Sequence, residues 1–530
     1  MTADLDWSLP YRAQRMPVLA RNVVATSQPL ATQAGVHALR QGGNAVDAAL
    51  ATAIALTVVE PTMNGIGGDL FAIVWHDGAL HGLNSSGRAP MGLTPQRLAG
   101  LRAMPKVGWD TVTVPGVVAG WVALSERFGR LPFDALFESA IRYARDGFLV
   151  SPTIARQWAA QVDVLAGQPG FAEAFMPGGR APRAGERFAQ PDQARTLESI
   201  AASRGDSFYR GELAARIAAF ARACGATMTE ADLAAHRADW VAPIAGDYRG
   251  ATLHEIPPNG SGIAAQIALG LLERLDAGAP PVDSADSIHL QVEAMKLAFA
   301  DAHAHVADPA AMRVRPEQLL DDGYLRSRAR LIDPKRAGPA PAGTPPSGGT
   351  VYLTAADEHG TMVSLIQSNF KGFGSGVVVP GTGIALHNRG MGFSLQPGHP
   401  NQLAGGKRPF HTIIPAFVTR AGRPLMSFGV MGGNMQPQGH VQMMVRMFDH
   451  AQNPQACADG PRWRIDDAGA LTLEAAYAGA VADELARRGH AVQIAPPDSL
   501  EFGSAQLILR LDDGYAAASE PRRDGQAAGF

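Results

Sequence analysis

The residue best placed for chemistry in this sequence is a threonine that opens a predicted β-strand directly after two glycines. Thr350 follows Gly348 and Gly349. A threonine hydroxyl becomes a useful nucleophile when its own free α-amine serves as the general base, which requires a cut in the chain immediately before that threonine. The glycine pair is suitable for such a cut, so Thr350 is a candidate nucleophile. A β-branched residue at a strand start is also ordinary, and the hypothesis needs further residues nearby.

The sequence after Thr350 predicts a β-hairpin that brings a second hydroxyl to this threonine. Two segments with a period of two flank a four-residue turn at 357–360. Counting outward from that turn places Thr350 opposite Gln367, within one residue of Ser368. Ser368 is therefore the candidate that orients the Thr350 hydroxyl through a hydrogen bond.

A further pair of glycines is suited to stabilise negative charge. Gly432 and Gly433 lie between a predicted strand and a predicted helix at 440–447. Backbone N–H groups near a helix start can point at the oxyanion that develops on a carbonyl under attack. The pair predicts an oxyanion hole, although tight strand-to-helix turns also use glycine.

The elements that must position these residues lie on either side of one linker. Residues 335–349 are mostly glycine, proline and small residues, so this segment cannot bury a face and we expect it to be exposed. Before the linker, the spacing of apolar residues predicts helices at 33–59 and 284–302 and a strand at 70–75. After it, the pattern changes to the period of two that is typical of strands.

Composition indicates a globular protein and excludes several partners. The 530 residues are 46% hydrophobic and 18% charged with a formal net charge of −3, which fits neither a disordered chain nor a nucleic-acid-binding protein. Cys224 and Cys457 are too few for a disulfide framework, so a reducing compartment fits best. No apolar signal segment lies in 1–17, and the longest apolar tract, 48–59, is too short to span a membrane. We therefore expect a cytoplasmic protein without nucleic-acid or membrane partners.

Three other patterns do not support a competing chemistry. The glycine-rich run at 65–70 lacks the third glycine of a dinucleotide motif and follows a predicted helix. Asp301, His303 and His305 are two residues apart on a predicted helix, where neighbours project about 200° from each other, so they cannot share one metal ion. The sequence contains no Gly-x-Ser-x-Gly motif, which argues against a serine α/β-hydrolase.

Eight short runs, in the same order and spread over almost the whole chain, resemble the γ-glutamyltransferase family of N-terminal nucleophile hydrolases. They lie at 42–47, 58–61, 65–68, 114–116, 293–297, from Thr350 onward, 406–408 and 432–433. So many ordered matches make the resemblance specific.

The resemblance implies an α+β fold, a four-layer αββα sandwich, and self-cleavage at the Gly349–Thr350 bond. The products would be a large subunit, 1–349, which includes the exposed linker 335–349, and a small subunit, 350–530, which stay partners in the mature enzyme. Thr350 would act first on its own preceding peptide bond and then on substrate, through an acyl ester. No metal or organic cofactor is implied, and a homo-oligomer is allowed.

At the substrate site the sequence departs from the γ-glutamyl enzymes that it resembles. In those enzymes an arginine binds the α-carboxylate of the donor, and this arginine corresponds to Ser86 here, with Arg88 two positions further on. The aspartate with which they bind the α-amine of the donor corresponds to Gly392. Burying an ammonium group without a partner costs several kcal/mol. The usual recognition of a glutamyl donor is therefore incomplete in this sequence.

Other polar and aromatic residues take those places and are the candidate substrate-binding groups. A guanidinium is a fixed cation whose planar fork matches a carboxylate. Gaining an arginine while losing the acidic partner of an amine suggests an acyl donor with a carboxylate and no α-amine. The candidates are Arg389, Arg88, His411, Thr412, Phe370, Asn434 and Gln436.

We therefore predict a self-processing threonine amidohydrolase that hydrolyses a small acidic amide, oxamate-like or glutaryl-like, through an acyl-enzyme on Thr350. The pattern resembles the branch of the family that contains oxamate amidohydrolase and glutaryl-type cephalosporin acylases. One alternative is a glutathione hydrolase or γ-glutamyltransferase. Another is a catalytically dead scaffold that binds a small anion, against which the intact Thr350 argues.

Overall fold

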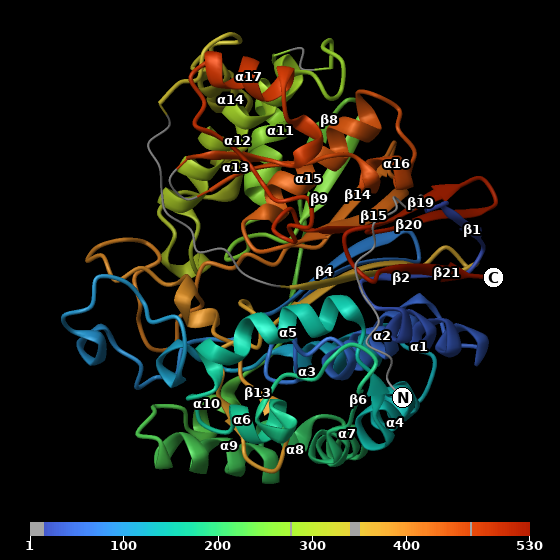
Figure 1. The fold of residues 1–530 in the computed structure, drawn as a ribbon, viewed down its shortest axis with the longest axis vertical. Helices are drawn as coiled ribbons and strands as arrows, with labels where there is room; N and C mark the ends of the chain where they lie inside the picture. Colours follow the sequence, from blue (N-terminus) through green and yellow to red (C-terminus); the bar gives the residue numbers. More distant parts are fainter. Residues whose placement is uncertain (1–14, 276–277, 340–349, 467–468) are drawn as a thin grey trace.

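Two stacked β-sheets, each covered on its outer face by helices, form the four layers of the computed structural model (Figure 1). The structure describes residues 15–275, 278–339, 350–466 and 469–530. The predicted linker falls within these ranges only over 335–339. Segment 340–349, with the predicted cleavage site at Gly349, lies outside the described residues.

The first sheet holds the predicted hairpin at its centre. All of its neighbouring strands are antiparallel. In spatial order the strands are β21 (Gln526–Gly529), β2 (Val23–Thr26), β10 (Val351–Ala356), β11 (Met362–Ser368), β3 (Asp69–His76), β4 (Ala79–Ser85) and β7 (Asp239–Val241).

The second sheet is also antiparallel and packs face to face on the first. Thr354 of the first sheet and Ser427 of the second are joined by a 2.6 Å hydrogen bond between their hydroxyl groups. In spatial order its strands are β1 (Val18–Ala20), β20 (Gly514–Ser519), β19 (Ser504–Leu511), β15 (Arg423–Met431), β14 (Ala416–Arg420), β9 (Ala251–Glu255) and β8 (Ile244–Tyr248).

The helices divide between the two outer faces (Figure 1). Those on the side of the first sheet are α1 (Pro29–Arg40), α2 (Ala45–Val59), α3 (Val117–Phe128), α4 (Glu138–Asp146), α5 (Pro152–Leu165), α6 (Phe171–Phe175), α7 (Pro191–Ser203), α8 (Asp206–Tyr209), α9 (Glu212–Ala223) and α10 (Glu230–Ala235). Those on the side of the second sheet are α11 (Ile263–Glu273), α12 (Ala285–His305), α13 (Pro316–Leu319), α14 (Asp322–Ala329), α15 (Met435–Phe448), α16 (Pro454–Asp459) and α17 (Ala480–Arg487).

Short strands complete the chain outside the two large sheets. They form the pairs β5 (Phe148–Leu149) with β6 (Arg187–Phe188) and β12 (Val378–Val379) with β13 (Ile384–Ala385), and the three-stranded sheet of β16 (Trp463–Ile465), β17 (Leu471–Leu473) and β18 (Val492–Ile494).

The predicted helix at 33–59 is wrong, because two helices occupy this region. Gly42 has a φ of +90°, which a helix cannot continue through. Asn44 then caps α2, since its side-chain oxygen accepts hydrogen bonds from the N–H groups of Val46 and Asp47. The glycines of this run therefore act as a helix break.

The predicted hairpin is confirmed, but its register differs from the prediction by one residue. Ala356 pairs with Met362, not Thr361, because Thr361 belongs to the turn and its carbonyl accepts a hydrogen bond from Asp357 N–H. Val351 consequently pairs with Gln367. This places Thr350 directly opposite Ser368.

The other predicted elements are present with longer bounds. Helix α12 begins after Ser284, whose hydroxyl caps it by accepting a hydrogen bond from Ser287 N–H, and it continues to His305 instead of 302. Strand β3 adds one residue at each end of the predicted 70–75. Helix α15 starts at Met435, five residues before the predicted 440, and thus directly after the glycine pair.

Candidate active site

Four polar side chains form a row across one end of the first sheet. Thr350 lies opposite Ser368, Ser368 pairs with Asp69, and continuing the pairing of β3 with β4 places Asp69 opposite Ser86. Residues directly opposite each other point to the same face of a sheet. None of the four is more than 1% exposed. The row faces the second sheet, since Thr354, an even number of residues from Thr350, contacts that sheet.

The Thr350 hydroxyl has two described polar neighbours. Its Oγ1 lies 3.2 Å from the Oγ of Ser368, and it accepts a 3.4 Å hydrogen bond from the Nε2 of Gln436. Ser368 Oγ in turn accepts a 2.7 Å hydrogen bond from the N–H of Phe370, which has a φ of +77°. A non-glycine residue in this region is strained and often marks a functional site. The backbone at Phe370 therefore fixes the hydroxyl that lies against Thr350.

Gln436 connects Thr350 to the predicted oxyanion glycines. Its Oε1 accepts a hydrogen bond from Ile414 N–H, which directs Nε2 to the Thr350 hydroxyl. The carbonyls of Gly432 and Gly433 accept the first hydrogen bonds at the start of α15, from Met435 and Gln436. The N–H groups of the two glycines precede that first turn and are not used by the helix. The geometry fits an oxyanion hole, and that role stays a prediction.

A buried carboxylate next to Ser368 gathers three nitrogen-bearing side chains. Asp69 Oδ2 lies 2.9 Å from His411 Nε2, 3.5 Å from His387 Nδ1 and 3.9 Å from Arg389 Nε. Burial alone would raise the pKa of Asp69, but His387, His411 and Arg389 together lower it below its ordinary value. Asp69 is therefore a stable anion within the fold.

The two histidines of this cluster are neutral. Burial, with a contribution from Arg389, lowers the pKa of His411 to about 3, and burial also lowers the pKa of His387. His411 Nδ1 accepts a hydrogen bond from Ile413 N–H, so its proton is on Nε2 and is donated to Asp69. Arg389 is thus the cation of the cluster.

Arg389 is a fully buried guanidinium that keeps part of its hydrogen-bonding capacity unused. Nη1 donates to Thr412 Oγ1 at 2.9 Å, and the guanidinium stacks 4.2 Å from the centre of the Phe370 ring. Its Nε and Nη2 have no hydrogen-bond partner in the described chain. Burial lowers the pKa of Arg389 to about 9, partly offset by Asp69, so the group is still charged at neutral pH. Unused buried N–H groups on a cation fit a carboxylate ligand.

The structure brings most of the predicted site residues together, but not Arg88. Its side chain is 48% exposed and donates to Asp308 at 3.0 Å and to the carbonyl of Gly406 at 3.1 Å. Arg88 therefore faces another part of the surface. Gly392 has no room for a larger side chain, because a Cβ would lie 2.4 Å from the carbonyl oxygen of Phe410.

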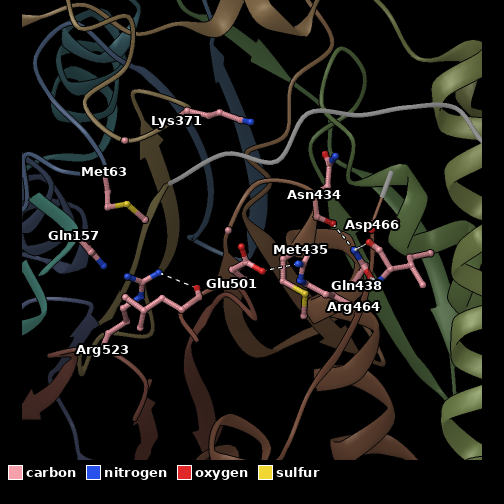
Figure 2. A pocket seen from close by; sticks show the side chains of 14 residues that line it. Met63, Gln157, Lys371, Asn434, Met435, Gln438, Arg464, Asp466, Glu501 and Arg523 are labelled. Atoms are coloured by element: carbon pink, nitrogen blue, oxygen red, sulfur yellow. Dashed lines mark hydrogen bonds and ion pairs between the residues drawn. The ribbon is translucent and has the colours of Figure 1, made fainter. Parts of the chain in front are cut away.

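Asn434 lies at the edge of a cavity of about 410 Å³ that also includes Gly432 (Figure 2). Gly432, one of the two predicted oxyanion glycines, lines this cavity, whereas Asp69, His387 and His411 do not. Arg389 is not among its lining residues.

Two residues of the site were missed by the sequence analysis as functional groups. Asp69 stands in the glycine-rich run 65–70, and a charged residue directly after two glycines at a strand start was a usable signal. His387 carries no sequence signal, because it reaches Asp69 only through a loop that the fold returns to β3.

Another buried cluster offers metal-ligating atoms but is satisfied without an ion. His289, Glu293 and His490 lie with ligand atoms within 4.8 Å of one another. His289 Nδ1 and His490 Nε2 share a 2.7 Å hydrogen bond, and Lys296 lies 2.7 Å from the Glu293 carboxylate. The ammonium group already supplies the positive charge there. Glu293 and Lys296 also bind the N–H and carbonyl of Gly338, so the cluster anchors the chain just before the undescribed segment.

Asp301, which the sequence places near His303 and His305 on one helix, is ion-paired with Arg328 at 2.9 Å.

Of the helices within the described ranges, none combines the length and apolar character needed to cross a bilayer.

Comparisons with known proteins agree on one family. The family model described as gamma-glutamyltranspeptidase matches residues 31–530. A crystal structure of cephalosporin acylase from Bacillus halodurans superposes with a TM-score of 0.94 at 48% identity, over 99% of both chains. The oxamate amidohydrolase proenzyme of Klebsiella pneumoniae is 39% identical over 94% of this chain and 97% of its own. The glutathione hydrolase-like YwrD proenzyme of Bacillus subtilis is 37% identical over 96% and 98%.

Proposed function

Because this chain belongs to the gamma-glutamyltranspeptidase family, we propose that it is a self-processing threonine amidohydrolase that acts on small acidic amides. The family and the structural neighbours confirm the predicted enzyme class and the α+β fold of the N-terminal nucleophile hydrolases. The observation that carries the substrate proposal is the buried Arg389, whose Nε and Nη2 have no hydrogen-bond partner within the described residues.

Self-processing would convert the chain into a large subunit, 1–349, and a small subunit, 350–530. Relatives that are named proenzymes support this step. The cut would release the α-amine of Thr350, which then acts as the general base for its own hydroxyl. We also propose a cytoplasmic location, and a homo-oligomer stays a prediction.

In turnover, Thr350 Oγ1 would attack the carbonyl carbon of the amide while the α-amine of Thr350 takes the hydroxyl proton. The N–H groups of Gly432 and Gly433 would stabilise the oxyanion. The C–N bond then breaks, the proton passes to the departing amine, and the acyl group remains on Thr350 as an ester. Water hydrolyses that ester to the free acid and restores Thr350.

The acyl half of the substrate would lie toward Arg389. A carboxylate on the acyl group could accept from Nε and Nη2, while Thr412 and Phe370 hold the guanidinium in place. Gly392 has no side chain, and the Phe410 carbonyl occupies the space where a Cβ would lie, so this position supplies no carboxylate to an α-amine.

γ-Glutamyl transfer is the rival function, because some relatives are named glutathione hydrolases. A dead anion-binding scaffold is disfavoured by the contacts of Thr350 with Ser368 and Gln436.

A panel of donors with one shared leaving group tests the acyl preference. We expect glutaryl-4-nitroanilide to exceed γ-glutamyl-4-nitroanilide in kcat/KM by about tenfold or more, because an unpaired buried ammonium costs over about 1.4 kcal/mol. Oxamate hydrolysis is measured separately by ammonia release. A clear preference for the γ-glutamyl donor would instead establish the rival function.

Ser368→Ala tests the hydroxyl that orients the nucleophile. We expect kcat to fall by about ten- to a hundredfold with little change in KM, because the variant loses a hydrogen bond at the reacting oxygen and none to the substrate. Steady-state kinetics on processed protein give both constants. Ser364→Ala is the matched control, since Ser364 lies four residues from Ser368 on β11 and pairs with Thr354 instead of Thr350. Unchanged rates of both processing and turnover in Ser368→Ala would remove Ser368 from the mechanism.

A further inference from the structure

The side-chain amide of Gln436 is fixed between two groups, and one of them is the nucleophile. Gln436 is fully buried on the first turn of α15. Its Oε1 accepts a 3.0 Å hydrogen bond from Ile414 N–H, and its Nε2 lies 3.4 Å from Thr350 Oγ1. An amide group has one accepting and one donating end, so the bond from Ile414 leaves the donating end for Thr350. Gln436 therefore donates to the reacting oxygen and does not accept from it.

The helix that carries Gln436 is held firmly against the second sheet. Helix α15 approaches β15 so closely that a Cβ on Gly439 would lie 2.5 Å from Cγ1 of Val430. His440, one turn after Gln436, accepts a 3.3 Å hydrogen bond from Val430 N–H with Nε2 and donates from Nδ1 to Glu255 Oε1 at 2.7 Å. These contacts fix the amide before any reaction begins, and a donor that needs no rearrangement stabilises charge most effectively.

The two described neighbours of Thr350 Oγ1 differ in what they offer to that oxygen. A hydroxyl group has one proton to donate and two lone pairs that accept. The Ser368 hydroxyl, 3.2 Å away, is able to donate or to accept. Gln436 Nε2 only donates, because an amide nitrogen has no accepting lone pair. Of these two neighbours, Gln436 is therefore the one that stabilises negative charge on Oγ1 in every orientation of the hydroxyl groups.

We propose that Gln436 is a catalytic residue that stabilises negative charge on Thr350 Oγ1 during self-cleavage as well as during turnover. The inference deepens the proposed function and rests on Thr350 as the nucleophile. A hydrogen bond to the charged form of a group favours that form, so donation from Nε2 makes loss of the hydroxyl proton easier. As a substrate-binding candidate Gln436 would contact the acyl donor, whereas this role is exerted on the nucleophile itself.

The donor acts wherever Oγ1 gains negative charge. In self-cleavage, Oγ1 attacks the carbonyl carbon of Gly349, the C–N bond to Thr350 breaks, the hydroxyl proton ends on the released amine, and water hydrolyses the resulting ester. In turnover, the α-amine takes the hydroxyl proton as Oγ1 bonds to the carbonyl carbon of the substrate. Water then adds to the acyl ester while the α-amine takes one of its protons. The C–Oγ1 bond breaks with its electron pair on Oγ1, and the α-ammonium passes the proton to that oxygen.

Gln436→Met removes the donor and keeps the length of the side chain. We expect kcat to fall by about ten- to a hundredfold with KM changed by less than about twofold, and the rate constant of self-cleavage to fall by a similar factor. Cell-free synthesis followed by timed denaturing electrophoresis gives the cleavage rate, and steady-state kinetics on processed protein give kcat and KM. Self-cleavage involves no substrate, so a glutamine that only bound substrate would leave its rate unchanged.

Gln436→Glu supplies a group that donates only when it is protonated. A neutral carboxyl group keeps an oxygen for Ile414 N–H and offers its O–H to Thr350, whereas a carboxylate has no proton to donate. We expect the kcat of this variant, divided by the wild-type kcat at the same pH, to rise by about tenfold or more from about pH 8 to about pH 5, because burial raises the pKa of a carboxyl group. Division by the wild-type value removes the titration of the α-amine. The same ratio for Gln436→Met should stay constant, and a merely structural role predicts no pH dependence for either variant.

Gln442→Met is the matched control on the same helix. Gln442 is 2% exposed, and both ends of its amide bond to the backbone of Trp463, not to Thr350. The variant should lower the thermal midpoint, because it breaks buried hydrogen bonds, yet change kcat and the cleavage rate by less than about twofold. A loss of activity as large as that of Gln436→Met would overturn the proposal.

The proposal is also overturned if Gln436→Met leaves both self-cleavage and kcat unchanged, or if the ratio for Gln436→Glu is flat or rises with pH. The kcat of each variant is measured with glutaryl-4-nitroanilide and with γ-glutamyl-4-nitroanilide. The fold loss should be the same for both, because Oγ1 is common to both reactions. If the γ-glutamyl donor is the better one and both lose equally, the acidic-acyl function fails and the role of Gln436 stands.

Discussion

Thr350→Ala is expected to leave the protein as one uncut chain of 55.7 kDa and to abolish amide hydrolysis. The substitution removes the hydroxyl that lies against Ser368 and Gln436 and therefore both the self-cleavage and the acyl-enzyme. Loss of a catalytic nucleophile typically lowers kcat by more than about 10⁴-fold. Denaturing electrophoresis, with N-terminal sequencing of the smaller wild-type fragment, checks that the fragment begins at Thr350.

Thr350→Ser is the control for this experiment, because it keeps both a hydroxyl and the α-amine that a cut would release. We expect this variant to process and to turn over substrate more slowly than wild type. Folding of Thr350→Ala is verified by its circular dichroism and its thermal midpoint. A wild-type chain that stays uncut and is nevertheless active would show that the proposed mechanism is wrong.

The parts of the site that the sequence predicted are those set by local structure. The hairpin follows from a period of two around a short turn, and counting along it places Thr350 opposite Gln367, within one residue of Ser368. The one-residue difference in register arose because Thr361 belongs to the turn, where its carbonyl accepts from Asp357. Counting from a four-residue loop could not reveal that hydrogen bond.

The parts that the sequence did not predict depend on contacts between distant segments. Asp69 meets His387, His411 and Arg389 only because β3 lies beside β11 and two loops fold over that edge. Arg88 is near Ser86 in the chain, yet Asp308, more than 200 positions away, holds its guanidinium elsewhere. A sequence shows which residues are charged, but the choice of partner is made by tertiary packing.

The helix break at 42–44 has a similar origin. The apolar and small residues on both sides favour one long helix, whereas a positive φ at Gly42 and the cap at Asn44 divide it. The cap holds α2 against the central hairpin, because Asp357 in the turn of that hairpin accepts a hydrogen bond from Ala45 N–H. The start of this helix is therefore tied to the strands that carry Thr350 and Ser368.

Replacing Arg389, the buried cation of the site, is expected to have the second large effect on activity. Arg389→Met should lower kcat/KM for a glutaryl anilide by about 10²–10³-fold, because a buried charge that loses its partner costs about 2–5 kcal/mol. The matched neutral donor, the pentanoyl anilide, has the same chain without the carboxylate and should lose little. The preference of wild type for the acidic donor should therefore disappear. Steady-state kinetics with both donors measure the change.

Arg389→Lys separates the charge from the shape of the guanidinium. The lysine keeps a cation beside Asp69 but cannot offer Nε and Nη2 to one carboxylate, so we expect a smaller loss for the glutaryl donor, about 1–3 kcal/mol in kcat/KM. This variant also controls for misfolding, because Arg389→Met leaves the buried Asp69 carboxylate without its cation, whereas Arg389→Lys keeps one there. Equal effects of Arg389→Lys on all donors, with a γ-glutamyl anilide as the best of them, would refute the carboxylate role. The family's γ-glutamyl chemistry would then be the function of this site, with the α-amine bound by groups other than Gly392.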